Sequence, residues 1–167
     1  MRDRNGGKMS FDKILVAIDM SEIHKNVFER ALSLAQKNNA SLMLLHALSP
    51  EEENSPLPIP PNLTEMYPAA GNDLTLEIWR QQWQEFERQG VEVLQSLAQK
   101  AIKAGVRVQY EQIPGSPART ICQVAREWQA NLIVIGHRGR SGLSEMLLGS
   151  VSNYVVHHAP CSVLLVR

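Results

Sequence analysis

The segment 136–152 has residue types and spacings that suit the binding of a phosphate group. Gly136 is followed after two residues by Gly139. Nine further residues lead to Gly149 and Ser150. Glycine adopts backbone conformations that a side chain forbids, and it lets a ligand approach the main chain closely. Successive N–H groups in such a loop form a concave site for an anion. The spacing therefore predicts phosphate binding, with an ordinary turn as the alternative.

A helix is expected to begin directly after these glycines, at about Ser150. The first N–H groups of a helix have no partner within it, and the positive end of the helix dipole lies there. The N–H groups of Val151 and Ser152 and the Ser150 hydroxyl should therefore face one pocket. Arg138 and Arg140 add local positive charge. Together the two halves of the segment predict a site for nucleotide phosphates.

A carboxylate stands at the end of the first apolar run of the chain. The run 13–18 is nearly unbroken, which is typical of a strand buried on both faces, and Asp19 follows it. Two other phosphate-binding patterns are missing: there is no G-x-x-x-x-G-K-[ST], and no G-x-G-x-x-G opens the first strand–helix unit. The acid within the glycine segment, Glu145, is expected on a solvated turn. No catalytic residue and no metal ligand is therefore assigned.

The rest of the chain alternates short apolar runs with helical stretches, which is typical of a parallel sheet covered by helices on both faces. The expected strands are 13–18, 41–48, 106–113, 132–135 and 162–166. The expected helices run from a cap at Ser21 to Asn38, from 75 to 104, from a cap at Ser116 to Trp128, and from Ser150 to just before Pro160. The predicted fold class is α/β: an open, doubly wound five-stranded parallel sheet of Rossmann-like type.

The connections between the strands indicate where a ligand would bind. Crossovers between parallel strands are right-handed, and ligands of open sheets bind beyond the carboxyl ends of the strands, where the winding direction reverses. This rule brings Asp19, Leu48 and Gly136 into one candidate site. The run 106–113 alternates apolar and polar residues, so its strand is expected toward an edge of the sheet.

Composition and charge favour a folded cytoplasmic protein. Of the 167 residues, 44% are hydrophobic and 20% charged, values close to globular averages. Because 17 Lys and Arg balance 17 Asp and Glu, no overall field attracts the chain to nucleic acid or an acidic membrane. The apolar run 14–18 is too short for a membrane helix or a signal-peptide core. We therefore expect no nucleic-acid partner and no membrane partner.

One domain is expected over residues 11–167, since a chain of this length has room for one core. Residues 1–10 match no core element and are expected to form a disordered extension. A Pro-rich insertion is expected at about 49–74, because six of the nine prolines lie between Pro50 and Pro68. Few residues there could build a strand or a long helix, so this insertion is expected to be an exposed excursion.

For the aromatic and histidine side chains, structural roles are mostly favoured over ligand binding. The helix 75–104 begins with an aromatic face that includes Trp79 and Trp83. No basic stripe accompanies these rings, so packing in the core or against protein is expected, not nucleic-acid stacking. His46 ends the second strand and is expected to be a satisfied structural polar residue. His137 is a weaker candidate for phosphate contact.

The glycine and serine spacing described above, G-2x-G-9x-G-[ST], resembles the nucleotide motif of the universal stress protein family, and it is specific. Other similar segments are 13–21, 45–47, 115–117 and 159–166. The resemblance covers the chain from about Phe11 to the end. It departs locally at His137 and Arg138, where a small residue often precedes His or Arg in that family.

This resemblance implies an adenine nucleotide α-hydrolase-like fold that binds ATP, or AMP or ADP, often with Mg²⁺ or Mn²⁺. It also implies a homodimer paired through the last strand. By position, the residues on the adenine and ribose side are Ala17, Asp19 and Ala47. Those that flank the ribose and phosphates are Gly136, Arg138, Gly139 and Arg140. Those that hold the phosphates are Gly149, Ser150, Val151 and Ser152.

Two functions from different classes remain open on the sequence. The first is a nucleotide-responsive stress or signalling module, in which ATP occupancy sets dimer geometry or partner choice. The second is a slow ATP hydrolase or nucleotidyl-transfer enzyme of the adenine nucleotide α-hydrolase type. Adenylating relatives carry an S-G-G-x-D-S-like loop after the first strand, whereas this chain has Ala-Ile-Asp-Met-Ser at 17–21. The missing glycines favour the first function.

Overall fold

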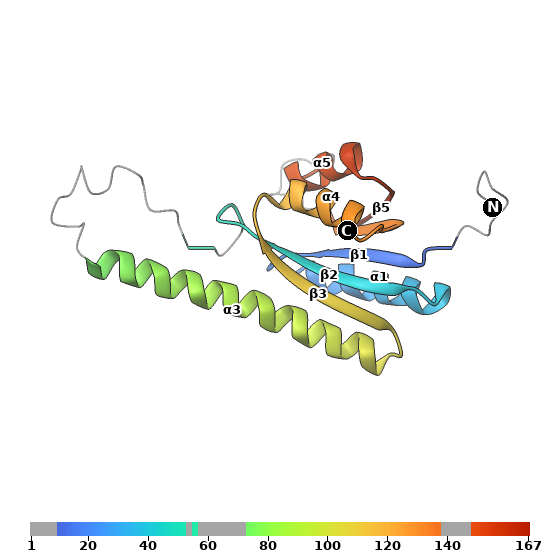
Figure 1. The fold of residues 1–167 in the computed structure, drawn as a ribbon, viewed down its shortest axis with the longest axis horizontal. Helices are drawn as coiled ribbons and strands as arrows, with labels where there is room; N and C mark the ends of the chain where they lie inside the picture. The colour runs from blue at the N-terminus through green and yellow to red at the C-terminus, as the bar shows by residue number, and fades with distance from the viewer. Residues whose placement is uncertain (1–9, 53–54, 57–72, 138–147) are drawn as a thin grey trace.

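The structure is a computed structural model that describes residues 10–52, 55–56, 73–137 and 148–167 (Figure 1). The described strands are β1 (Lys13–Ile18), β2 (Ser41–Leu48), β3 (Arg107–Pro114), β4 (Leu132–Gly136) and β5 (Ser162–Val166). The described helices are α1 (His24–Asn38), α3 (Asp73–Lys103), α4 (Pro117–Glu127) and α5 (Ser150–His158). Apart from Ser10, the predicted extension lies outside the described residues, as does most of the predicted Pro-rich insertion.

The five strands form one parallel sheet in the order β3-β2-β1-β4-β5. Ile18 of β1 is in register with His46 of β2, and Val16 of β1 is in register with Val134 of β4. The chain winds outward from β1 to β3 and then adds β4 and β5 on the other side of β1. The winding direction therefore reverses between β1 and β4. This topology confirms the doubly wound α/β fold and the predicted edge position of β3.

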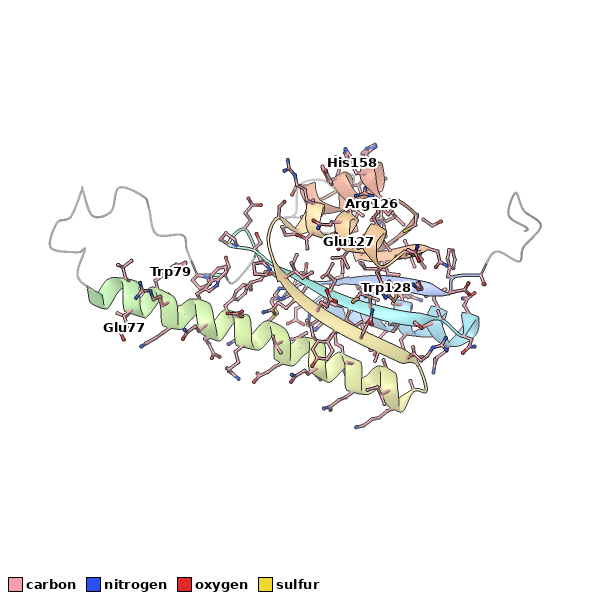
Figure 2. The ribbon with its side chains drawn as sticks, viewed as in Figure 1. Glu77, Trp79, Arg126, Glu127, Trp128 and His158 are labelled. Carbon is pink, nitrogen blue, oxygen red and sulfur yellow. The ribbon has the colours of Figure 1, made fainter. Side chains whose placement is uncertain are left out.

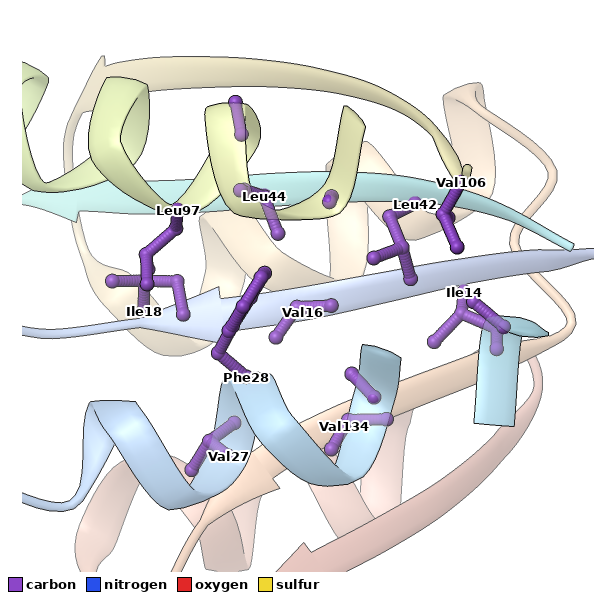
Figure 3. Close-up of a cluster of buried hydrophobic side chains, with 14 of the residues drawn as sticks. Ile14, Val16, Ile18, Val27, Phe28, Leu42, Leu44, Leu97, Val106 and Val134 are labelled. Carbon is purple, nitrogen blue, oxygen red and sulfur yellow. The ribbon is translucent and has the colours of Figure 1, made fainter. Parts of the chain in front are cut away.

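Alternate residues of the central strands face two different hydrophobic layers. Val16 belongs to a buried cluster with Phe28 of α1 and Leu97 of α3, which cover one face of the sheet (Figure 3). Leu15 belongs to a second cluster with Val155 of α5 and the apolar face of α4, on the opposite face. Burial on both faces explains why the central strands are almost continuously apolar in sequence.

The ends of the helices follow the predicted signals better than their beginnings do. Asn39 directly follows α1 and Gly105 lies two residues beyond α3, and both adopt the left-handed conformation, at φ 53° and 76°. The predicted cap at Ser21 is wrong, because the N-cap of α1 is Ile23. Ser21 bonds to a neighbouring carboxylate instead. Ser116 does occupy the N-cap of α4, but its side chain makes no capping hydrogen bond.

Helix α3 is anchored to the sheet by its second half, and its first half projects beyond the sheet (Figure 1). Phe86 and Leu94 of this helix are buried against the sheet. Trp79 lies on the earlier part of the helix (Figure 2). Its ring stacks on that of Trp83, with centroids 5.7 Å apart. Neither this helix nor any other in the described part of the chain combines the length and hydropathy needed to cross a membrane.

Candidate functional site

The carboxyl edge of the sheet gathers predicted site residues from three strands. Asp19 directly follows β1, and the pairing of Ile18 with His46 places Asp19 beside Ala47, the next residue of β2. On the other side, β4 runs parallel to β1 and ends at Gly136. Ligands of doubly wound sheets bind at this edge where the winding reverses. The structure therefore brings part of the predicted site to the switch point between β1 and β4.

The turn after β1 is fixed by its own polar groups. The Ser21 N–H and hydroxyl both donate to Oδ1 of Asp19, at 3.1 Å and 2.5 Å. The Ser21 carbonyl in turn accepts from the His24 N–H at 3.2 Å. Such a side-chain turn orients a carboxylate relative to the strand that precedes it. The role that the sequence assigned to Ser21 as a helix cap is thus replaced by a role in positioning Asp19.

The structure gives a reason for glycine at position 136 that the sequence analysis did not predict. Gly136 does not adopt a left-handed φ, so the expected backbone freedom is not used at this position. A Cβ placed here would lie 3.1 Å from Cγ2 of Ile23 and 3.4 Å from Cγ2 of Val27. Glycine therefore allows the beginning of α1 to approach the end of β4 closely, beside the turn that carries Asp19.

The beginning of α5 has the groups expected for anion binding. Gly149 is the N-cap, and its carbonyl accepts from the Asn153 N–H at 2.8 Å, the first bond of the helix. The N–H groups of Ser150, Val151 and Ser152 precede this bond, so they are the ones a helix start offers to an anion. The Ser152 hydroxyl is buried and donates to the Gly149 carbonyl at 3.0 Å, so it serves the helix and not a ligand.

The remaining predicted phosphate residues, Arg138, Gly139 and Arg140, lie outside the described residues, as does Glu145. His137 is described, and its N–H donates to the carbonyl of Val166 at 2.7 Å. This bond extends the pairing of β4 and β5 by one residue.

His46 and Glu52 form a buried polar pair beside the site, and the sequence predicted the role of His46 alone. His46 has partners on both ring nitrogens, as expected for a structural histidine: Glu52 Oε2 and Gln112 Oε1, each at 2.8 Å. Glu52 was missed, because it lies in the acidic triplet 51–53 at the start of the Pro-rich insertion. Its side chain is only 6% exposed, so the expectation of an exposed excursion is wrong there. The one sequence signal was an acid that closely follows a strand with a histidine near its end.

The chain is a doubly wound α/β protein with Asp19 and Gly136 at its switch point. A family model described as the universal stress protein family matches residues 10–167, so the chain belongs to that family. Universal stress protein Sll1388 of Synechocystis sp. is 36% identical over 162 residues, covering 95% of this chain and 99% of that protein. Slr1101 of the same organism is 54% identical over 104 residues, covering 62% of this chain and 96% of that protein.

Solved structures share the fold at low sequence identity. Universal stress protein UspA from Lactobacillus plantarum superposes with a TM-score of 0.73 at 23% identity, covering 96% of this chain and all of that one (100%). A universal stress protein in complex with cAMP gives 0.61 at 21% identity, covering 95% and 98%. A family member from Arabidopsis thaliana with AMP bound gives 0.58 at 23% identity, covering 93% and 90%.

Proposed function

We propose that this chain binds an adenine nucleotide, with ATP as the main candidate, and acts as a nucleotide-responsive stress or signalling module in the cytoplasm. The observation that carries the proposal is the position of Asp19 and Gly136 at the switch point of the sheet, the usual ligand site of this fold. Two solved proteins of the same fold that hold cAMP and AMP support the class of ligand.

The nucleoside would lie over the ends of β1 and β2. Ala17 is half-buried and Ala47 is 7% exposed, and their methyl side chains leave space for a base and a ribose at the strand ends. Asp19 already accepts two bonds from Ser21 at Oδ1. As a carboxylate at the strand end, Asp19 would accept a hydrogen bond from a ribose hydroxyl.

The phosphates would be held by the glycine loop and the beginning of α5. Gly136, Gly139, Arg138 and Arg140 would flank them, and the N–H groups of Ser150 to Ser152 would donate to them. The exposed Ser150 hydroxyl is a further donor, whereas Ser152 would contribute its N–H alone. Mg²⁺ or Mn²⁺, when present, would neutralise phosphate charge through oxygen ligands, several of them the phosphates themselves.

Replacement of Gly149 by valine tests the phosphate site. Gly149 has φ −57° and ψ 154°, which valine adopts readily, so Gly149→Val should keep the fold. The added side chain stands where phosphate must approach the helix start, so ATP affinity measured by calorimetry should fall at least about tenfold. His157→Ala, exposed at the other end of α5, is the control. Unchanged ATP binding by Gly149→Val would refute the site.

The same samples address turnover. Tight ATP binding with negligible product supports the module, whereas release of more product than enzyme present supports the slow hydrolase or nucleotidyl-transfer alternative. This assay needs purified protein and a chromatographic readout of ATP, ADP and AMP.

We also propose that two copies pair through β5. This strand lies at an edge of the sheet and has β4 on one side only. Its residues Val163, Leu164 and Leu165 are only half-buried. An open, largely apolar strand edge is suited to pairing with another chain.

A further inference from the structure

A series of polar bonds joins the ends of β1, β2 and β3. Oε1 of Glu52 accepts from the Met20 N–H at 2.7 Å, and its Oε2 lies 2.8 Å from Nε2 of His46. Nδ1 of His46 lies 2.8 Å from Oε1 of Gln112, whose Nε2 donates to the Glu87 carbonyl at 3.0 Å. The side chains of His46 and Glu52 are 2% and 6% exposed. The bond between His46 and Glu52 is therefore shielded from water, whereas the bond from Gln112 to Glu87 is exposed.

The geometry of these bonds fixes the protonation of His46. Because Gln112 donates its amide to the Glu87 carbonyl, the amide oxygen faces His46, so Nδ1 must carry a hydrogen. The other ring nitrogen, Nε2, lies 2.8 Å from Oε2 of Glu52, and a carboxylate there accepts a hydrogen from it. A histidine that donates from both nitrogens is an imidazolium. The pair is thus a buried His⁺–Glu⁻ ion pair.

The surroundings of the ring agree with this assignment. Burial alone lowers the pKa of His46, but the hydrogen bond and charge of Glu52 outweigh it, with Gln112 and Asp19 also raising it. The resulting pKa lies above the ordinary value of 6.5. The charged groups that face the ring are thus Glu52, from the segment after β2, and Asp19, at the end of β1.

Helix α3 closes the remaining side of the ring with uncharged groups. The Phe86 ring meets His46 edge-on at 6.2 Å. Gly90 packs so closely that a Cβ there would lie 2.6 Å from Nδ1 of His46. The nearby Glu87 contributes its carbonyl to Gln112, and its side chain is exposed. Protonation of His46 is therefore coupled chiefly to Glu52.

We propose that Glu52 and His46 act as a protonation-dependent latch that positions the turn carrying Asp19 for the nucleoside, a role that rests on the proposed nucleotide site. Glu52 holds the Met20 N–H, one residue beyond Asp19, while His46 is protonated. When His46 loses its Nε2 proton, two lone pairs face each other and the bond to Glu52 is lost. The Met20 amide then loses its anchored acceptor, and the turn loosens. Adenine nucleotide affinity should therefore fall as pH rises through the titration of His46.

Three variants separate the latch from a general effect of charge or pH. Glu52→Ala removes the acceptor, so ATP affinity should fall about tenfold, as expected for loss of a charge-assisted buried bond. Glu52→Gln keeps an oxygen for Met20 and offers an N–H to neutral His46, so it should hold the turn at every pH. Glu51→Ala removes a neighbouring exposed carboxylate and should behave as the wild type. The nucleotide phosphates titrate in the same way with both proteins. The ratio of the wild-type affinity to the Glu52→Gln affinity at each pH therefore removes their contribution.

The test combines NMR and calorimetry on the whole chain between about pH 5.5 and 9, the range in which histidine titrates. In ¹⁵N-labelled wild type, the chemical shift of the Met20 amide should change with pH, and the midpoint of that change should equal the titration midpoint of the His46 ring. Wild-type ATP affinity, relative to Glu52→Gln, should decline through the same midpoint. Circular dichroism verifies that each variant is folded.

Other outcomes overturn the proposal in distinguishable ways. If ATP binds but Met20 does not follow His46, or if Glu52→Ala binds ATP as Glu51→Ala does, the latch is refuted while the nucleotide site stands. If Met20 follows His46 but the wild type binds no adenine nucleotide at any pH, the proposed function is refuted, and the positioning role of Glu52 is refuted with it.

Discussion

His46 and Glu52 should make the stability of the fold depend on pH in one direction. Their ion pair raises the pKa of His46 in the folded state, so folding binds the proton more tightly than the unfolded chain does. The stabilisation should be complete below about pH 6.5 and be lost as pH rises through the raised pKa. Urea unfolding at a series of pH values measures it. Glu52→Gln should flatten this dependence; parallel curves for the two proteins would count against the ion pair.

Gly90 permits the closest contact between α3 and the polar pair. A Cβ at this position would lie 2.2 Å from Oε1 of Gln112 and 2.6 Å from Nδ1 of His46, so one of these groups must move. Gly90→Ala should therefore destabilise the protein by about 2 kcal/mol despite the higher helix propensity of alanine. Chemical denaturation gives the value, with the exposed Ser96→Ala as control. A stabilised Gly90→Ala would show that α3 is not seated against His46.

Residue roles could be predicted from the sequence only where a single local pattern decides them. His46 was expected to be a satisfied structural residue because it ends a buried strand, and the structure confirms it. Glu52 could not be found, because its burial depends on contacts with Met20 and His46 in other segments. Of the two roles predicted for Gly136, the left-handed backbone is not used, and close approach of a ligand stays a prediction. The contact with Ile23 could not be predicted, because it is a tertiary one.

Among the secondary-structure elements, α5 begins with polar groups of two kinds. One hydroxyl has a structural role, whereas the N–H groups are those proposed to bind the ligand. The Ser152 hydroxyl is buried and bonded to the Gly149 carbonyl. Ser152→Ala should therefore reduce the free energy of unfolding by about 1 kcal/mol while ATP affinity stays unchanged. Denaturation and calorimetry on one preparation measure both, and exposed Asn153→Ala is the control. Loss of affinity without loss of stability would assign the hydroxyl to the ligand instead.

Elements with strong local signals were predicted almost to the residue. The strands 13–18 and 41–48 have the predicted bounds, because burial on both faces makes their sequences continuously apolar. The beginning of α1 was placed too early, at a cap on Ser21. Ser21 does make polar contacts at this point of the chain, as a cap would, but its partner is the Asp19 carboxylate and not the first turn of α1.

At the scale of the whole molecule, the open edge at β5 predicts the oligomeric state. Light scattering should give a mass about twice the 18.7 kDa of one chain. Val163→Lys places a charge on the half-buried strand edge and should shift the mass toward a single chain. Val156→Lys, on the exposed surface of α5, should leave the dimer intact. A monomeric wild type, or a dimer unaffected by Val163→Lys, would contradict pairing through β5.

The doubly wound class could be predicted because few arrangements satisfy right-handed parallel crossovers. The full order β3-β2-β1-β4-β5 was not predicted beyond the edge position of β3. The projection of the first half of α3 beyond the sheet could not be predicted. Its periodicity continues without a break past Phe86, so the sequence alone does not show where the sheet stops supporting the helix. Only the positions of the strand ends set that limit.

Amide chemical shifts during an ATP titration show whether an adenine nucleotide binds at the carboxyl edge of the sheet. We expect the largest changes at Asp19, Ala47, Gly136 and Ser150 to Ser152, and we expect them to saturate together. Shifts confined to the amino edge of the sheet, or no shifts at millimolar ATP, would contradict binding at the carboxyl edge.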